Sequence, residues 1–142
     1  MRIQVLLYEN AEAIFDLRKE VFVSEQGFPA DEEVDSIDKV ATHVACYDNS
    51  DVIACGRILI EDKIAHFCRI CVKRQFRHEG IGTQLCKFMI AYAKQERCEI
   101  IELNSQIHAI PFYEKLGFIQ GSEVMDAGIP HVKMMKSLLQ SH

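Results

Sequence analysis

The sequence predicts one α+β domain over residues 1–142, with a mixed, mostly antiparallel sheet flanked by helices. Three observations predict this fold class. Short segments of alternating apolar and polar residues, typical of strands, occur along most of the chain. Two longer segments carry apolar residues at helical spacing. One strand–loop–helix unit lies in the middle, and the other strands follow one another through short turns, as antiparallel strands do.

The first part of the chain is predicted to hold a strand and a helix. Residues 2–8 have the pattern of a strand. Asn10 is a favoured N-cap residue, and the apolar residues after it recur at helical spacing to about residue 23. Residues 24–40 are expected to be irregular or partly helical, because Gly27 and Pro29 interrupt any long element.

The centre of the chain is predicted to form a three-stranded meander. The strands are expected at residues 42–47, 52–60 and 64–72. Polar segments at 48–51 and 61–63 supply the turns between them.

After a polar loop, the chain is predicted to alternate again between helix and strand. The longest helix is expected over residues 80–96, where the apolar residues fall in one stripe. The remaining predicted elements are a buried strand at 100–103, a helix at 108–116 that ends at Gly117, and strands at 118–121 and 132–135.

Charge and hydropathy narrow the class of function. The net charge is −5 and the sequence pI is about 5.7. Nucleic-acid-binding proteins normally carry a basic face, so nucleic acid is not expected as a partner. The acidic balance suits a cationic substrate such as an amine. No signal peptide or membrane-spanning segment is visible, so the protein is expected to be soluble and cytoplasmic.

The six cysteines are interpreted as small core residues, because a cytosolic protein keeps its thiols reduced. His66, Cys68 and Cys71 resemble half of a zinc site. In a strand, however, Cys71 points to the opposite face from the other two, and no second pair stands at the required spacing. No metal site is predicted.

The most specific local feature is a glycine-containing loop before the longest predicted helix. It comprises Arg77, His78, Glu79, Gly80, Ile81, Gly82 and Thr83. Free N–H groups and the helix dipole make a helix N-terminus attractive to an anion, and the two glycines let a pyrophosphate approach the backbone. A dinucleotide fingerprint would need Gly at Leu85, and a P-loop would need Gly-Lys-Ser/Thr. From these residues alone, an anion site and an ordinary loop both remain open.

Two motifs carry a resemblance to a known family. Arg77-x-x-Gly80-x-Gly82 resembles the Q/R-x-x-G-x-G/A acetyl-CoA signature of the GNAT acetyltransferase superfamily. About thirty residues later, the segment from Ala109 to Phe118 resembles the family's A-x-x-(L/F)-Y-x-x-x-G-F signature. Further segments between about residues 18 and 136 are similar to the YjcF/ElaA-like branch.

The resemblance implies a cofactor site. The pyrophosphate of acetyl-CoA would lie on the backbone N–H groups of residues 77–83. The pantetheine arm would run along the backbones of Ile70, Cys71 and Val72, and an N–H near Val72 would hold the oxyanion. Gln106, where many members have Asn, and Phe112 are also expected at the cofactor. A covalent acetyl-Cys71 intermediate is not favoured, because no base is expected beside this thiol.

The resemblance also implies direct attack by a neutral amine, with Tyr113 as general acid. The candidate bases are Glu25, Glu33, His43 and His131, although both histidines equally suit structural roles. Arg57 and Arg69 lie on inner strands, where a charge must be paired or line a cleft. They are expected either to bind a carboxylate of the substrate or to pair with the acids of residues 31–38. These acids form either a solvated loop or a rim that attracts amines.

The predicted function is acetyl-CoA-dependent N-acetylation of a primary amine in a small molecule or peptide. Two alternatives remain: a coenzyme A-binding sensor without turnover, and a nucleotide-binding protein that uses the loop for ATP or NAD. Acetyl-CoA and the amine are the expected partners. A homodimer is left open.

Overall fold

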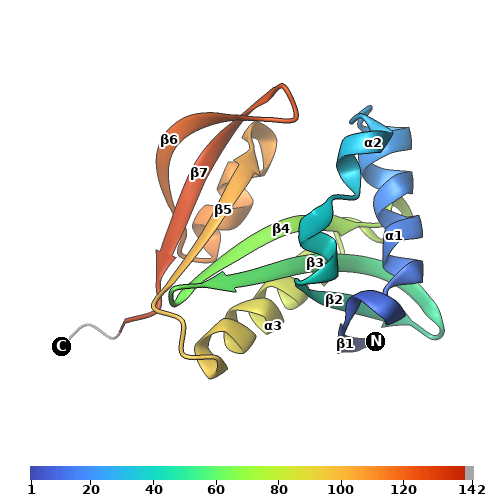
Figure 1. Cartoon of the computed structure of the whole chain (residues 1–142), viewed down its shortest axis with the longest axis horizontal. Coiled ribbons are helices and arrows are strands. Elements are labelled where there is room, and N and C mark those ends of the chain that lie inside the picture. Colours follow the sequence, from blue (N-terminus) through green and yellow to red (C-terminus); the bar gives the residue numbers. More distant parts are fainter. Residues whose placement is uncertain (140–142) are drawn as a thin grey trace.

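Seven strands form one sheet in the computed structural model, which describes residues 1–139 (Figure 1). The strands are β1 Arg2–Leu6, β2 Thr42–Asp48, β3 Asp51–Glu61, β4 Ile64–Val72, β5 Ile100–Gln106, β6 Ile119–Asp126 and β7 Ile129–Ser137. Their order across the sheet is β1-β2-β3-β4-β5-β7-β6. All neighbours are antiparallel except β4 and β5, which are parallel. The predicted mixed, mostly antiparallel sheet is confirmed.

Helices cover both faces of this sheet. The α-helices are α1 Glu12–Arg18, α2 Ala30–Glu33, α3 Ile81–Gln95 and α4 Ile110–Lys115. Short 3-10 turns are η1 Tyr8–Asn10, η3 Ser36–Lys39, η4 Arg74–Phe76 and η5 Ile107–Ala109, and η2 Lys19–Glu25 is π-helical. The apolar stripe of α3, including Leu85 and Met89, packs on one face with Val44 and Cys46 of β2. Helix α1 packs on the other face, where Ala45 of β2 points.

The start of the first helix differs from the sequence prediction. Asn10 is not its N-cap: it ends the 3-10 turn η1, and α1 follows Ala11, which makes no side-chain capping bond. The helix then widens into η2, where the Gln26 N–H reaches back to the Val21 carbonyl at 3.0 Å. The extra residue per turn in a π-helix changes which side chains face the sheet, and such segments are frequent at functional sites.

The last two strands are longer than predicted. Strand β6 is an edge strand with mostly exposed side chains, so its sequence lacks the alternation that marks a half-buried strand. It joins β7 through a tight turn in which Ala127 and Gly128 both have positive φ, 51° and 76°. Strand β5 also continues to Gln106, three residues beyond the predicted end. The extensions of β6 and β7 place Asp126 and His131 at the site described next.

Candidate active site

Strands β4 and β5 run side by side for four residues and then separate (Figure 1). Residues 64–67 pair with 100–103, and no pairing joins 68–72 to 104–106 in the described chain. The separation begins at a bulge: the register of β3 with β4 shifts between Cys55 and Arg57, and Arg69 of β4 has φ 55°. A bulge bends its strand, so β4 turns away from β5. The open edge of β4 can therefore receive another chain-like ligand.

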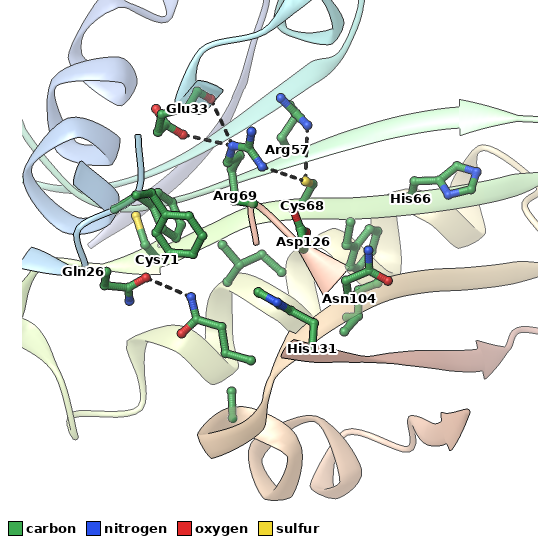
Figure 2. Close-up of a pocket in the computed structure, with 18 of the residues that line it drawn as sticks. Gln26, Glu33, Arg57, His66, Cys68, Arg69, Cys71, Asn104, Asp126 and His131 are labelled. Carbon is green, nitrogen blue, oxygen red and sulfur yellow. Dashed lines mark hydrogen bonds and ion pairs between the residues drawn. The ribbon is translucent and has the colours of Figure 1, made fainter. Parts of the chain in front are cut away.

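A cavity of about 960 Å³ fills the gap and extends over the open sheet face. Its walls come from β3, β4, β5, β7, the end of β6, the η2–η3 region and the start of α4. Figure 2 shows polar and charged side chains from these elements around it, including Glu33, Arg69 and His131. Ile70, Cys71 and Val72 all line the cavity.

The glycine-containing loop forms a second, smaller cavity of about 220 Å³ next to Val72. Its lining includes Arg77, His78, Gly80, Ile81, Gly82, Thr83 and Phe112. The first backbone hydrogen bond of α3 runs from the Gln84 N–H to the Gly80 carbonyl at 3.1 Å. The three N–H groups before Gln84 lie ahead of this bond, at the positive end of the helix dipole. The loop therefore has the donors that an anion needs.

The two loop glycines differ in what requires them. Gly80 has φ 80°, a conformation that other residues adopt only with strain. A Cβ on Gly82 would lie 3.5 Å from Phe112 Cζ and 3.6 Å from Val72 Cγ2, which is ordinary contact. Gly80 is therefore needed for the turn itself, whereas the protein interior has room for a methyl group at position 82.

Arg77 connects this loop to the end of η2. Its Nη2 donates to Glu25 Oε1 at 2.9 Å, and its Nε donates to the Val72 carbonyl at 2.9 Å. The hydrogen bond from Arg77 lowers the pKa of Glu25, although partial burial opposes the shift. Glu25 does not line the large cavity. The structure thus places Glu25 as the partner of Arg77 and not as a base facing an acceptor.

Gln106 stands at the end of β5, opposite η2. Its Nε2 donates to Gln26 Oε1 at 2.8 Å, and both residues line the large cavity. Cys71 is buried, and its Sγ lies 3.6 Å from Cys55 Sγ. The contact with Cys55 and burial both raise the pKa of the Cys71 thiol. A neutral, buried thiol is a poor nucleophile, so the geometry offers no support for an acetyl-Cys71 intermediate.

Tyr113 lines the cavity from α4 and is 9% exposed. Its ring packs edge-on against Phe112 and Phe118, with centroids 5.1 Å and 5.8 Å away. Burial raises the pKa of Tyr113 well above its ordinary value. The phenol therefore remains protonated across the neutral range and can donate a hydrogen bond to a leaving group, although the same shift makes it a weaker acid.

Two of the candidate bases occupy structural positions. His43 on β2 is fully buried, does not line the cavity, and donates from Nε2 to the Asp38 carbonyl at 2.8 Å. Glu33 lines the cavity, but Arg18 Nε donates to both of its oxygens and Arg69 Nε lies 2.9 Å from Oε2. Arginine donors thus occupy both oxygens of Glu33. The structure therefore argues against both as bases.

His131 has a different environment. It lies on β7, is 4% exposed and lines the cavity. Its Nδ1 is 2.8 Å from the Ile129 carbonyl, which can only accept, so Nδ1 carries the proton in the neutral ring. The lone pair then belongs to Nε2, which has no hydrogen-bond partner within residues 1–139 and, because it is not among the fully buried unpaired atoms there, is accessible from the cavity. Of the four candidates, His131 alone offers an unengaged basic atom in the cavity.

Arg57 and Arg69 belong to a set of ion pairs that we call the arginine–carboxylate network. Its members are Arg18, Arg57, Arg69, Glu33, Asp35 and Asp38. Arg57 Nη1 lies 2.9 Å from Asp35 and 3.0 Å from Asp38. Burial alone would raise the pKa of Asp38, but hydrogen bonds from Arg18, the Asp35 N–H and Arg57 lower it to about 2.

The network bears on the expectation that Arg57 and Arg69 bind a carboxylate of the substrate. Arg69 pairs with Glu33 at 2.9 Å and with Asp35 at 3.4 Å, so both guanidiniums face carboxylates of this chain. Neither guanidinium therefore offers an unpaired positive charge to a carboxylate of the substrate. The alternative expectation, pairing with the acids of residues 31–38, describes the geometry.

Several residues that line the large cavity were not predicted from the sequence as site residues. They are His66, Cys68, Glu102, Asn104, Asp126 and Lys133. Most lie at alternating positions of β4, β5 and β7, on the face that also carries His131. Knowing the true length of β7 would have placed His131 and Lys133 on one face. Three-residue groups of His, Cys, Asp or Glu that could hold a metal ion are absent from residues 1–139.

Comparison with known proteins agrees with the fold. The family model for the acetyltransferase (GNAT) domain matches residues 9–138. The uncharacterized N-acetyltransferase YjcF of Bacillus subtilis is 37% identical over 130 residues, covering 90% of this chain and 93% of YjcF. Protein ElaA of Escherichia coli is 31% identical over 135 residues, covering 91% and 88% of the two chains. The ElaA crystal structure superposes with a TM-score of 0.85, 26% identity, and coverage of 96% and 99%.

An aminoglycoside 6′-N-acetyltransferase complexed with coenzyme A has the same fold, with a TM-score of 0.82 at 16% identity, covering 100% of this chain and 99% of its own. The chain belongs to the GNAT acetyltransferase family. Within that family it is an N-acetyltransferase whose relatives include YjcF and ElaA. Among residues 1–139, every helix is too short or too polar to cross a membrane.

Proposed function

We propose that the protein transfers an acetyl group from acetyl-CoA directly to a primary amine of a small molecule or peptide. One observation carries the proposal: the free N–H groups of residues 81–83 at the start of α3, the open edge of β4 and the unengaged Nε2 of His131 border two cavities that both have Val72 in their lining. Acetyl-CoA supplies an activated thioester carbonyl. The chain must bind its phosphates, admit its thioester and manage two protons.

Each of these tasks has candidate groups. The helix N-terminus and Arg77 suit the phosphates, because N–H donors and a guanidinium recognise anionic oxygen. His131 Nε2 suits the proton of the incoming ammonium, since a neutral amine is needed for attack. Tyr113 suits the departing thiolate, to which it would give a proton as the new amide forms. The oxyanion would be held by an N–H of the β4 edge near Val72.

Thiol release from acetyl-CoA tests the proposal. The purified protein is incubated with acetyl-CoA and a panel of primary amines, and free coenzyme A is titrated. Tyr113→Phe keeps the ring between Phe112 and Phe118 and removes only the hydroxyl. We expect kcat to fall about 100-fold, the typical size of a general acid contribution. Tyr92→Phe on α3, whose hydroxyl is exposed, is the matched control and should change nothing.

A second variant tests the base. His131→Gln keeps a polar side chain but removes the basic nitrogen, so kcat/KM should fall by about 100-fold, the typical contribution of a general base. Tight acetyl-CoA binding with no release on any amine, unchanged by Tyr113→Phe, would instead identify a sensor. A larger rise in melting temperature with ATP or NAD than with acetyl-CoA would identify a nucleotide-binding protein.

A further inference from the structure

The charge of the cavity wall is unbalanced once its ion pairs are counted. Every Lys and Arg in the lining is in an ion pair: Arg57, Arg69, Arg77 and Lys133. Three lining acids have no ion-pair or side-chain hydrogen-bond partner within residues 1–139: Glu32, Glu61 and Asp126. The wall therefore carries a surplus of negative charge, although it contains several arginines.

The register of the sheet places one of these acids close to His131. Val124 of β6 is directly opposite His131 of β7, so the two side chains share a face. Asp126 is two residues along β6 and points to that same face, about 7 Å further on at the usual rise of a strand. Figure 2 shows Asp126 and His131 among the side chains around the cavity.

The remaining acids extend the negative field along the groove. Arg57, Leu59 and Glu61 line it at alternating positions of β3, and Glu32 lies on the opposite wall in α2. The arginine–carboxylate network contributes three positive and three negative groups, so it adds no net charge. An independent feature points to a ligand here: His131 is 4% exposed, yet its Nε2 has no partner in the described chain.

We propose that the acceptor is a di- or polycationic amine, whose reacting nitrogen lies at His131 and whose second ammonium is held by Asp126. The inference deepens the proposed function and rests on it. With the reacting nitrogen at His131, a second ammonium group separated from it by a short alkyl chain would reach the unpaired carboxylate of Asp126. A carboxylate on the acceptor, as in a free amino acid, meets only acids and arginines that are already neutralised. Longer polyamines gain further from Glu61 and Glu32.

Three amines of equal chain length test the charge preference: 1,4-diaminobutane, 1-aminobutane and 4-aminobutanoate. We expect kcat/KM to be about 5- to 10-fold higher for the diamine than for the monoamine, as one partly buried ion pair provides. The amino acid should be the poorest of the three. Asp126→Asn should bring the diamine-to-monoamine ratio close to one. Asp51 is an exposed acid at the start of β3 and does not line the cavity, so Asp51→Asn should leave the ratio unchanged.

A binding arm separates this inference from the proposed function. The same amines are titrated into the wild-type protein saturated with coenzyme A, and binding is followed by calorimetry at low and moderate salt. Tighter, salt-sensitive binding of the diamine supports the charge preference even where no amine releases thiol, an outcome that would refute only the acetyl transfer. Equal binding of all three amines, a preference for 4-aminobutanoate, or an unchanged ratio in Asp126→Asn would overturn the inference.

Discussion

If Arg77 binds the phosphates as proposed, replacing Glu25 with Gln is expected to tighten coenzyme A binding, because Glu25 would compete with the phosphates for Arg77. In the structure the Arg77 guanidinium donates to both oxygens of Glu25. The Arg77 and Glu25 side chains are 30% and 28% exposed, and Arg77 belongs to the glycine-containing loop. A phosphate that recruits Arg77 must first separate this pair. Gln has nearly the same shape as Glu and can keep one hydrogen bond to Arg77, but it is neutral. A phosphate would therefore not have to break an ion pair to reach Arg77.

The size of the effect follows from the exposure of the pair. Ion pairs with this much solvent access contribute about 0.4–1 kcal/mol, after screening and the ordering of two long side chains. Removing that competition should lower the Kd for coenzyme A by about two- to five-fold, at about 1.4 kcal/mol per factor of ten. Added salt should shrink the difference, because screening weakens the pair in the wild-type protein.

Calorimetric titration of coenzyme A into the wild-type and Glu25→Gln proteins measures this directly. Glu9→Gln, in the exposed turn η1 and outside the ion pairs of residues 1–139, is the matched control and should bind as the wild type does. Arg77→Gln should weaken binding. The reasoning fails if Glu25→Gln binds coenzyme A more weakly than the wild type. An unchanged Kd with a greatly reduced kcat would restore Glu25 as a general base.

Three further predictions concern stability and reactivity. Gly80→Ala should destabilise the protein by about 1 kcal/mol through its positive φ, whereas Gly82→Ala should stabilise it by about 0.5 kcal/mol, both measured by urea unfolding. The pKa of Asp38 is depressed to about 2, so its contribution of roughly 2 kcal/mol is present above pH 4 and lost as the pH falls towards 2; urea unfolding between pH 5 and 2 should show this slope. Cys68, the one cysteine that is not buried, should be alkylated by iodoacetamide well before Cys71, as peptide mass spectrometry will report.

The parts of the fold that sequence alone predicts are those with local signals. The apolar stripe of α3 and the two glycines at its start lie close together in the sequence, so the helix can be predicted from local pattern alone. The structure begins it at Ile81, directly after Gly80. Strand β6 has no such signal, because an exposed edge strand can carry polar side chains on both faces. The π-helical turn η2 depends on packing against the sheet, and its sequence alone indicates an ordinary helix.

In the candidate site, too, some features have local sequence signals and others depend on tertiary packing. His43 and His131 both lie on strands, and alternation alone cannot tell which one faces the cavity. The difference is a matter of sheet order: β2 lies on the far side of β3, whereas β7 is next to β5 at the gap. The arginine–carboxylate network is equally invisible locally, because Arg18 and Glu33 are 15 residues apart and Arg69 and Glu33 are 36 apart. Such contacts are fixed by tertiary packing.

The network also has a role that stability does not explain. Buried ion pairs contribute little net stability, because desolvation of the charges offsets their attraction, and apolar replacements are often as stable. Arg69, however, sits at φ 55° in the bulge, where its backbone is strained. Its side chain is held by the Glu33 carboxylate and the Glu33 carbonyl, and Glu33 is held in turn by the fully buried Arg18. The ion pairs thus anchor the bulge that separates β4 from β5, and the cavity depends on that separation.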